Sequence, residues 1–212
     1  MKFLNYLSKS YYRNLLEKRL YQYRSLITGR ILDIGSKNRK YDSFFKGNIT
    51  AIDIIPKPEL NIIKGDLTNL NFPSNTFDSV ICLEVFEYLE PKNFNKGFEE
   101  IFRVLNQNGK AIITIPFFYW QHKDNMRVTH KYLKNYFSQF SNIEFKIIRV
   151  GNRYTALYDV IRLSKKIETS VKLKNFSVKI LLFVFYLIIK ALSLENKVDL
   201  FYSGLFIVLN KK

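Results

Sequence analysis

The chain has 212 residues, of which 47% are hydrophobic and 16% aromatic, so its composition excludes an intrinsically disordered protein and fits one α/β domain with additions. A formal net charge of +16 favours partners that carry phosphate, such as nucleic acid or anionic lipid headgroups. The single cysteine, Cys82, excludes an intramolecular disulfide and a cysteine-built metal site, and a reducing compartment is expected.

Residues 1–29 are predicted to form a basic amphipathic helical extension. Apolar side chains recur at steps of three and four over residues 4–27, the helical period, and basic residues lie between them. The helix, in one or two pieces, either packs on the edge of a sheet or lies on a membrane surface. No continuous apolar run of signal-peptide length is found here, so we expect a cytoplasmic protein.

From Arg30 onward, short β-branched runs alternate with polar turns and helical stretches. A helix is expected over Asn93–Leu105, where apolar residues share one face. Strands that alternate with helical segments predict crossover connections and a largely parallel sheet. The predicted strands are Arg30–Ile34, Ile49–Ile54, Asn61–Lys64, Ser79–Leu83, Lys110–Ile115, Ile143–Val150 and Ser203–Leu209.

Residues 153–198 are predicted to be a helical insertion before the last strand. Its uninterrupted apolar run, Ile180–Ile189, spans only about 15 Å as a helix, half of a hydrocarbon core of about 30 Å. Lys179 and Lys190 lie three helical turns apart, an arrangement that suits a helix in a lipid interface with its lysines reaching outward. The segment Val178–Leu194 therefore faces a membrane, the protein core or an oligomer interface.

A candidate ligand site lies at the ends of the first two predicted strands. Asp33 ends the first strand and Asp53 ends the second, at the spacing by which doubly wound folds place a carboxylate on a ribose hydroxyl. The dinucleotide fingerprint G-x-G-x-x-G is absent, and Lys37 and Arg39 fill the small-residue positions that follow Gly35 in such loops. This departure weakens a hydride-transfer hypothesis.

An ordered series of motifs then resembles class I S-adenosylmethionine-dependent methyltransferases, in the branch associated with surface-polysaccharide and other glycan pathways. The motifs are "ILDIG", "AIDII", "GDLTNLNFPSNTFDSVICLEVFEYLEP", "EEIFRVLNQNGKAIITIPF" and "HKDNMRVTHKYL". They cover about residues 30–140. The resemblance implies a methyltransferase domain over residues 30–212 with a Rossmann-like, doubly wound, mostly parallel sheet of seven strands and flanking helices.

The same resemblance implies that S-adenosylmethionine is the cofactor. It places a turn beside the methionine part, a carboxylate on the ribose hydroxyls, and a second carboxylate on the adenine amino group. The residues so implied are Asp33, Gly35 and Ser36 in the turn, Asp53 and Ile54 at the ribose and adenine, Asp66 and Leu67 at the adenine, and Glu84 lining the pocket. Carboxylates accept hydrogen bonds from hydroxyls and amines, while apolar residues cover a flat ring.

The segment after the fifth strand resembles the part of this family that surrounds the acceptor. His122 is the candidate general base, and it is equally compatible with a structural role in the loop. Methyl transfer needs positioning and, for a hydroxyl acceptor, a base, so no metal is expected. The candidate acceptor-pocket residues are Tyr119, Trp120, Asp124, Arg127 and Thr129, of which the last two also suit a structural role.

Three functions are compatible with the sequence. The favoured one is O-methylation of a glycan, glycolipid or other lipid-linked acceptor, with residues 1–29 and 171–194 facing an anionic membrane on its inner side. The alternatives are a catalytically impaired fold that binds a membrane or partner, and an RNA or DNA methyltransferase. The last is disfavoured because "TIPF" lacks the second proline of the motif that methylates adenine amino groups.

Overall fold

The computed structural model describes residues 9–118, 124–167, 172–197 and 200–212, with side-chain surroundings for all of these except 163–167 and 172–179. The chain divides into two compact units. The helical unit consists of residues 1–18, 118–121 and 149–204, and the sheet unit of residues 19–117, 122–148 and 205–212.

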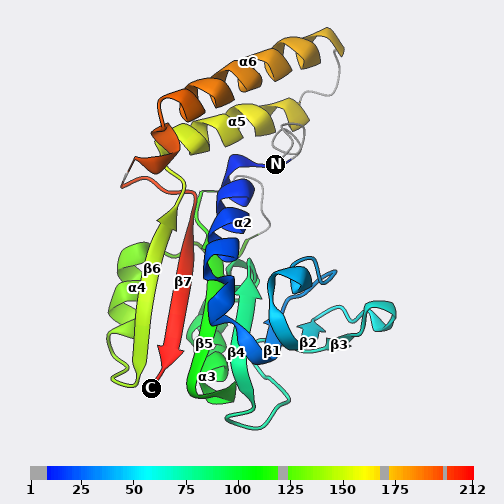
Figure 1. The fold of residues 1–212 in the computed structure, drawn as a ribbon, viewed down its shortest axis with the longest axis vertical. Coiled ribbons are helices and arrows are strands. Elements are labelled where there is room, and N and C mark those ends of the chain that lie inside the picture. Colours follow the sequence, from blue (N-terminus) through cyan, green and yellow to red (C-terminus); the bar gives the residue numbers. More distant parts are fainter. Residues whose placement is uncertain (1–8, 119–123, 168–171, 198–199) are drawn as a thin grey trace. The chain divides into compact units, whose positions relative to one another are not determined.

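The sheet has seven strands in the order β3-β2-β1-β4-β5-β7-β6 (Figure 1). The first five strands in this order, β3 to β5, pair in parallel, and β7 runs antiparallel to its neighbour β6. Every predicted strand is confirmed, although β5 begins at Leu105, five residues earlier than expected, and so includes "NQNG". The bounds are β1 Thr28–Ile34, β2 Lys46–Asp53, β3 Ile62–Lys64, β4 Phe77–Leu83, β5 Leu105–Pro116, β6 Ile143–Val150 and β7 Gly204–Lys211.

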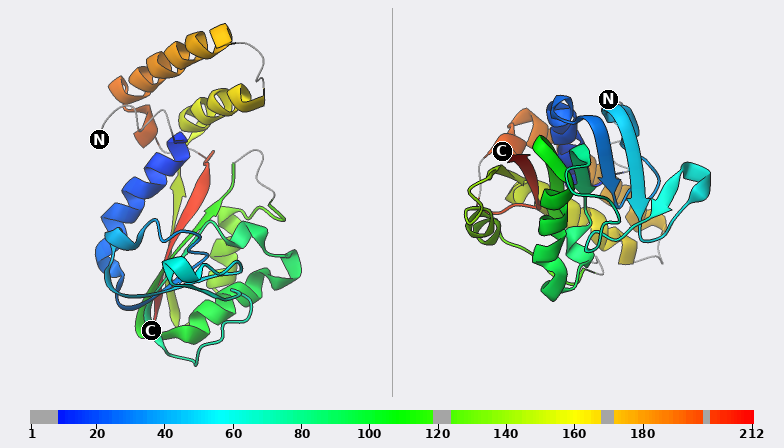
Figure 2. Two further views of the ribbon diagram at one scale, coloured as in Figure 1. Left: turned by 90° about the vertical axis from the view of Figure 1, so that its right-hand side faces the viewer. Right: turned by 90° about the horizontal axis from the view of Figure 1, so that it is seen from below.

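Helices cover both faces of this sheet (Figure 2). On one face lie α3 (Phe94–Val104) and α4 (His130–Phe137), which meet where the Phe98 and Phe137 rings are 4.9 Å apart. On the other face Tyr23, the last residue of α2 (Tyr11–Tyr23), packs on Phe206 of β7. Because both faces are covered, the later parts of the central strands, "VICL" of β4 and "AIITIP" of β5, can be largely apolar.

The connections in the first half of the sheet are short. Residues 35–45 join β1 to β2 with one 3-10 turn, η2 (Asp42–Phe44), and residues 54–61 join β2 to β3 with η3 (Pro58–Leu60). No α-helix lies between β1 and β4 in this fully described stretch. Ile54, Ile55 and Ile63 are consequently left more than half exposed beside β2 and β3.

The helical unit is built from α5 (Arg153–Ile167), α6 (Lys172–Ala191), the 3-10 turn η6 (Leu194–Asn196) and the first turns of α2. Its core contains Tyr11, Tyr158, Leu182, Ile189 and Leu194. The predicted helical insertion is thus confirmed as two helices. Within the described residues, no helix combines the length and the apolar character that crossing a membrane requires.

The N-terminal helix is anchored by a buried carboxylate. Asp159 of α5 accepts hydrogen bonds from the backbone N–H groups of Tyr11 and Tyr12, at 2.6 and 2.9 Å, and so caps the start of α2. Tyr12, Leu16 and Leu20 are at most 1% exposed. These residues are packed in the protein, and membrane contact by residues 1–29 stays a prediction.

Lys190 does not reach outward as the lipid-interface hypothesis for this segment would place it. Its ammonium group pairs with both carboxylate oxygens of Glu195, at 2.7 and 2.8 Å, and the Tyr11 hydroxyl donates to the same carboxylate. The pair lies at the C-terminal end of α6, where a cation also interacts favourably with the helix dipole. The side chain of Lys179 lies outside the described residues.

Candidate functional site

Four acidic residues lie at the carboxyl ends of four adjacent parallel strands. Asp33 is the second-to-last residue of β1, Asp53 ends β2, Asp66 follows β3 by two residues, and Glu84 follows β4 directly. The carboxyl ends of parallel strands share one edge of the sheet, and the order β3-β2-β1-β4 makes these four strands neighbours. The structure therefore brings the predicted cofactor carboxylates to one edge, which is the ligand side of open α/β sheets.

Asp33 is the most buried of these groups, with 8% of its surface exposed. Burial raises the pKa of its carboxyl group to about 6, although the Ser36 hydroxyl and the Arg39 charge act in the opposite direction. A cationic or hydrogen-bond-donating ligand strongly stabilises the ionised form of such a carboxylate, because the ligand replaces the hydration that burial has removed.

The turn after Asp33 depends on Gly35. The backbone N–H groups of Gly35 and Ser36 both donate to the Ile52 carbonyl oxygen, at 2.9 and 3.1 Å, which folds the turn over the end of β2. Gly35 has φ +73°, and a Cβ atom there would lie 2.3 Å from Cγ2 of Val85. Both the backbone conformation and the close approach therefore require glycine.

Lys37 and Arg39 adopt the backbone conformation that glycine would supply. Their φ values are 53° and 54°, in the left-handed region, which costs about 1–2 kcal/mol for a residue with a Cβ atom. The Lys37 N–H group donates to Oδ2 of Asp53 at 3.0 Å, while the Lys57 ammonium group donates to the Lys37 carbonyl oxygen at 2.7 Å. The loop thus keeps a glycine-type path because contacts from β2 and from the segment after it hold the backbone.

The Arg39 side chain braces the connection between β1 and β2. Its guanidinium group pairs with Asp42 at 2.6 Å and donates to the carbonyl oxygens of Ile49, Leu60 and Asn61. The five donors of a guanidinium group suit this bridging role, whereas glycine would leave these carbonyl oxygens without it. The replacement of glycine by arginine is therefore a structural specialisation of the loop.

Asp53 and Asp66 keep acceptor capacity for a ligand. Asp53 accepts one backbone N–H on each oxygen, from Lys37 and Ile55, and each oxygen has a second lone pair. Asp66 accepts the N–H and hydroxyl of Thr68 on Oδ1 alone. Ile54 is 68% exposed beside Asp53, and its predicted contact with the adenine stays a prediction.

Leu67 lies in the protein core. It is 3% exposed, and its Cγ atom is 3.3 Å from the position of a Cβ atom on Gly97 of α3. Its predicted contact with the adenine ring stays a prediction.

Glu84 is held in a strained conformation by a partner that the sequence did not reveal. Its φ of 58° is unusual for a residue with a Cβ atom. The Glu84 N–H group donates to the Thr114 carbonyl oxygen at 3.0 Å, and the Thr114 hydroxyl donates to Oε1 of Glu84 at 2.9 Å. The only available signal was a threonine inside the apolar run "AIITIPF". Backbone strain held in place at a strand end is typical of functional sites.

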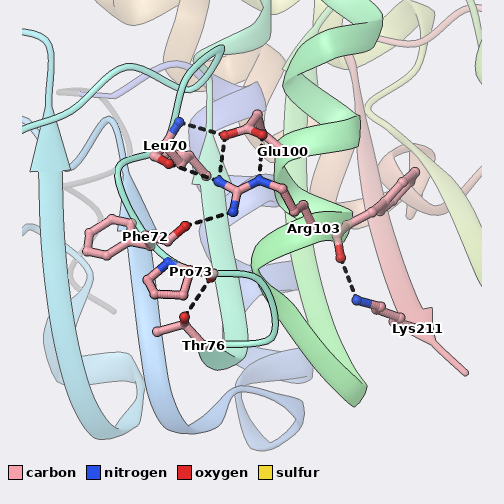
Figure 3. A network of polar contacts seen from close by, with 8 residues as sticks. Leu70, Phe72, Pro73, Thr76, Glu100, Arg103 and Lys211 are labelled. Atoms are coloured by element: carbon pink, nitrogen blue, oxygen red, sulfur yellow. Dashed lines mark hydrogen bonds and ion pairs between the residues drawn. The ribbon is translucent and has the colours of Figure 1, made fainter.

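A charged pair on α3 holds the loop between β3 and β4 (Figure 3). Arg103 pairs with Glu100 and donates to the carbonyl oxygens of Phe72 and Leu70, at 2.7 and 2.8 Å. Glu100 in turn accepts the Leu70 N–H at 2.7 Å, and the Arg103 guanidinium lowers the pKa of Glu100. The Arg103 side chain of "RVL" thus binds the backbone of "LNFP" and fixes this loop on α3.

The segment after β5 is tied down at several points. Arg127 pairs with Asp124 at 2.7 Å and donates to the Phe117 carbonyl oxygen, and the Thr129 hydroxyl accepts the Tyr132 N–H at the start of α4. The structural roles weighed for Arg127 and Thr129 are therefore present, and acceptor contact by Asp124, Arg127 and Thr129 stays a prediction. Tyr119, Trp120 and the candidate base His122 lie outside the described residues.

Glu87 adds a further anchor for this segment. Its carbonyl oxygen accepts the Asn125 N–H at 2.8 Å, and its side chain is fully buried.

Within the described ranges, no group of three His, Cys, Asp or Glu side chains is arranged to hold a metal ion. The edge of the sheet thus offers carboxylates for hydroxyl and amine donors and an exposed apolar side chain for a ring, a set that fits S-adenosylmethionine.

Residues 32–113 match the family model described as a methyltransferase domain. The structure resembles a SAM-dependent methyltransferase from Archaeoglobus fulgidus with a TM-score of 0.59 and 15% identity, over 94% of each chain. It resembles phosphoethanolamine N-methyltransferase 2 of Haemonchus contortus, solved with S-adenosylmethionine, with a TM-score of 0.55 and 14% identity, over 94% of this chain and 52% of that one. The [4+2]-cyclase SpnF shares the fold, with a TM-score of 0.59 and 14% identity over 92% of this chain and 79% of that one.

Among curated proteins, an uncharacterised protein of Methanocaldococcus jannaschii is 38% identical over 53 residues. The matched stretch is 25% of this chain and spans only 22% of that relative. The fold and the matched motifs together define the class I methyltransferase fold. Residues 32–113 carry the match to the methyltransferase domain, and the solved structures share the fold.

Proposed function

We propose that this protein is an S-adenosylmethionine-dependent methyltransferase that methylates a hydroxyl group of a glycan, glycolipid or other lipid-linked acceptor. The observation that carries the proposal is the placement of Asp33, Asp53, Asp66 and Glu84 at one edge of the sheet, inside the matched domain. The preference for a glycan or lipid-linked acceptor rests on the motif resemblance and on the basic, apolar composition of residues 153–198.

When bound, S-adenosylmethionine supplies a methyl group on a positively charged sulfur. Asp53 and Asp66 would accept hydrogen bonds from the ribose and the adenine amino group, and Asp33 would face the cationic part of the ligand. A nearby positive charge stabilises a buried carboxylate more than an exposed one, because the buried group has already lost its hydration. The protein's main task is then to hold the acceptor oxygen in line with the methyl group, while a base such as His122 removes the hydroxyl proton.

The conformation of the loop that contains Lys37 and Arg39 argues against the alternative of a catalytically impaired fold. Lys37 and Arg39 do not block the backbone path, because both adopt the glycine-type conformation and the Arg39 side chain is engaged with Asp42. This geometry favours a working cofactor site. The nucleic-acid alternative gains no specific support from the described residues.

Calorimetric titration with S-adenosylmethionine and S-adenosylhomocysteine tests the proposal. We expect micromolar binding by the wild type and a loss of at least about 10-fold for Asp53→Asn, which removes a charged acceptor. Asp53→Asn is preferable to alanine because the amide oxygen can still accept one of the two loop N–H groups. Glu144→Gln, an exposed charge on β6, is the matched control and should bind as the wild type does.

Two further results decide between the functions. No binding by correctly folded wild-type protein would refute the methyltransferase proposal. With binding established, transfer of labelled methyl groups to glycolipid extracts, and not to RNA or DNA, would support the proposed acceptor class. Labelling of nucleic acid alone would overturn it.

A further inference from the structure

One side of α6 is apolar and exposed. Between 44% and 63% of the surface of each of these side chains is exposed: Ile180, Leu181, Val184, Leu187, Ile188 and Leu192. They recur at steps of three and four, so they form one continuous strip along the helix. An exposed apolar strip of this size on a helix marks an interaction surface.

The opposite side of the same helix is already packed. Leu182 and Ile189 are buried in the core of the helical unit, and Phe185 and Tyr186 are packed against that core. The Phe185 ring stacks near Tyr158 of α5 at 6.3 Å. The exposed strip is therefore not the face that holds α6 in the fold, and it is left for a partner outside this unit.

The charges of the unit favour a partner of negative charge. By sequence, residues 162–179 carry six cationic residues and one acidic residue, Glu168; the range includes the end of α5 and the start of α6. Two of the other acidic residues in the unit are engaged within it, because Asp159 caps α2 and Glu195 pairs with Lys190. No acidic residue occurs in α6 itself.

We propose that α6 docks flat on an anionic lipid surface, with the strip from Ile180 to Leu192 inserted below the headgroups and the cations of residues 162–179 at the headgroup phosphates. Apolar burial and attraction to anionic lipid act together in such interfacial helices. The ten-residue apolar run is about 15 Å long and therefore suits a helix that lies in the interface rather than one that crosses it. A second copy of α6 would offer apolar contact but no negative charge for these cations.

The only cysteine in the sequence is the buried Cys82, so single cysteines can be labelled selectively at the surface. We would attach an environment-sensitive fluorophore to Val184→Cys and, as a control, to Ser43→Cys, an exposed position in η2. Vesicles of phosphatidylcholine containing phosphatidylglycerol should shift the emission of the Val184→Cys label to the blue and leave the Ser43→Cys label unchanged. Vesicles of phosphatidylcholine alone should give a weaker shift, and high salt should reduce the shift with anionic vesicles.

A triple variant tests the strip without disturbing the packed side. L181Q/V184Q/L187Q should weaken cosedimentation with anionic vesicles by roughly 100-fold, because three apolar side chains no longer insert. L60Q/I63Q replaces two exposed apolar residues of the sheet unit and should bind vesicles as the wild type does. Helical content and S-adenosylmethionine binding should be unchanged in both variants.

Absence of vesicle binding by the wild type, or binding unaffected by the triple variant, would overturn the proposal. A wild-type dimer in solution that the triple variant converts to a monomer, without any vesicle binding, would assign the strip to self-association instead. The proposal goes beyond the enzymatic one, and the vesicle assays need neither cofactor nor acceptor. A failure of lipid docking is therefore distinguishable from a failure of the methyltransferase proposal.

Discussion

Asp33→Asn is expected to stabilise the protein near neutral pH while impairing its cofactor site. Burial raises the pKa of the Asp33 carboxyl group from 3.8 to about 6. This difference corresponds to about 3 kcal/mol of free energy by which ionised Asp33 disfavours the folded state. An asparagine side chain of nearly the same shape carries no charge, so the variant avoids this cost.

The sign of the effect fixes the pH at which it is seen. Because the folded protein binds the Asp33 proton more tightly than the unfolded chain, it carries more bound protons between about pH 4 and pH 6. The free energy of unfolding contributed by this group is highest below about pH 4 and falls as the pH rises to about 6. The free energy of unfolding of the variant should therefore exceed that of the wild type by up to about 3 kcal/mol at pH 7. The two values should be equal near pH 4.

Urea denaturation at a series of pH values measures this difference directly. Asp159→Asn is an informative comparison, because burial also raises the pKa of Asp159 to about 6. Both Asp159 oxygens accept a backbone N–H, from Tyr11 and Tyr12, and an amide has only one oxygen. Losing a charged acceptor costs about 1–3 kcal/mol, so Asp159→Asn should gain little or nothing at pH 7.

The same Asp33→Asn variant should bind S-adenosylmethionine about 10–100-fold more weakly than the wild type in calorimetry, because a charged partner is lost. A stability difference between Asp33→Asn and the wild type that does not change with pH would refute the assigned pKa. Full cofactor affinity in the variant would refute the assigned role of Asp33.

Substitutions at four other positions test the loops and the cap. Lys37→Gly should raise the free energy of unfolding by up to about 1 kcal/mol in urea titrations, because glycine adopts a positive φ without strain. Arg39→Gly should lower the free energy of unfolding, because the ion pair with Asp42 is lost. Arg103→Lys should lower stability by about 2 kcal/mol and speed amide exchange over residues 65–76, because an ammonium group cannot replace the guanidinium fork; unchanged exchange would contradict the bracing role. Thr129→Ala should cost about 1 kcal/mol, measured by thermal unfolding, through loss of the α4 cap, and Thr129→Ser should restore most of it.

Much of the fold could be predicted because its signals are local. The apolar runs of β4 and β5 and the helical periodicity of Asn93–Leu105 are properties of neighbouring residues, and they depend on burial on one or both faces. The placement of Asp33 and Asp53 at adjacent strand ends followed from strand spacing together with parallel pairing. The apolar strip of α6 was equally visible as a run in the sequence, although its exposure was not.

Only the tertiary structure decided how the polar side chains are used. The partners of Glu84 and Lys37 are Thr114 and Asp53, which lie 30 and 16 residues away in the sequence, and the Arg39 guanidinium reaches carbonyl oxygens up to 22 residues away. Lys190, which the lipid-interface hypothesis would place outward, pairs with Glu195. Hydrophobic periodicity determines which face of an element is buried, because it reflects how each residue partitions between water and the core. Hydrogen bonds between distant segments leave no such period, because they depend on which loops the folded chain brings together.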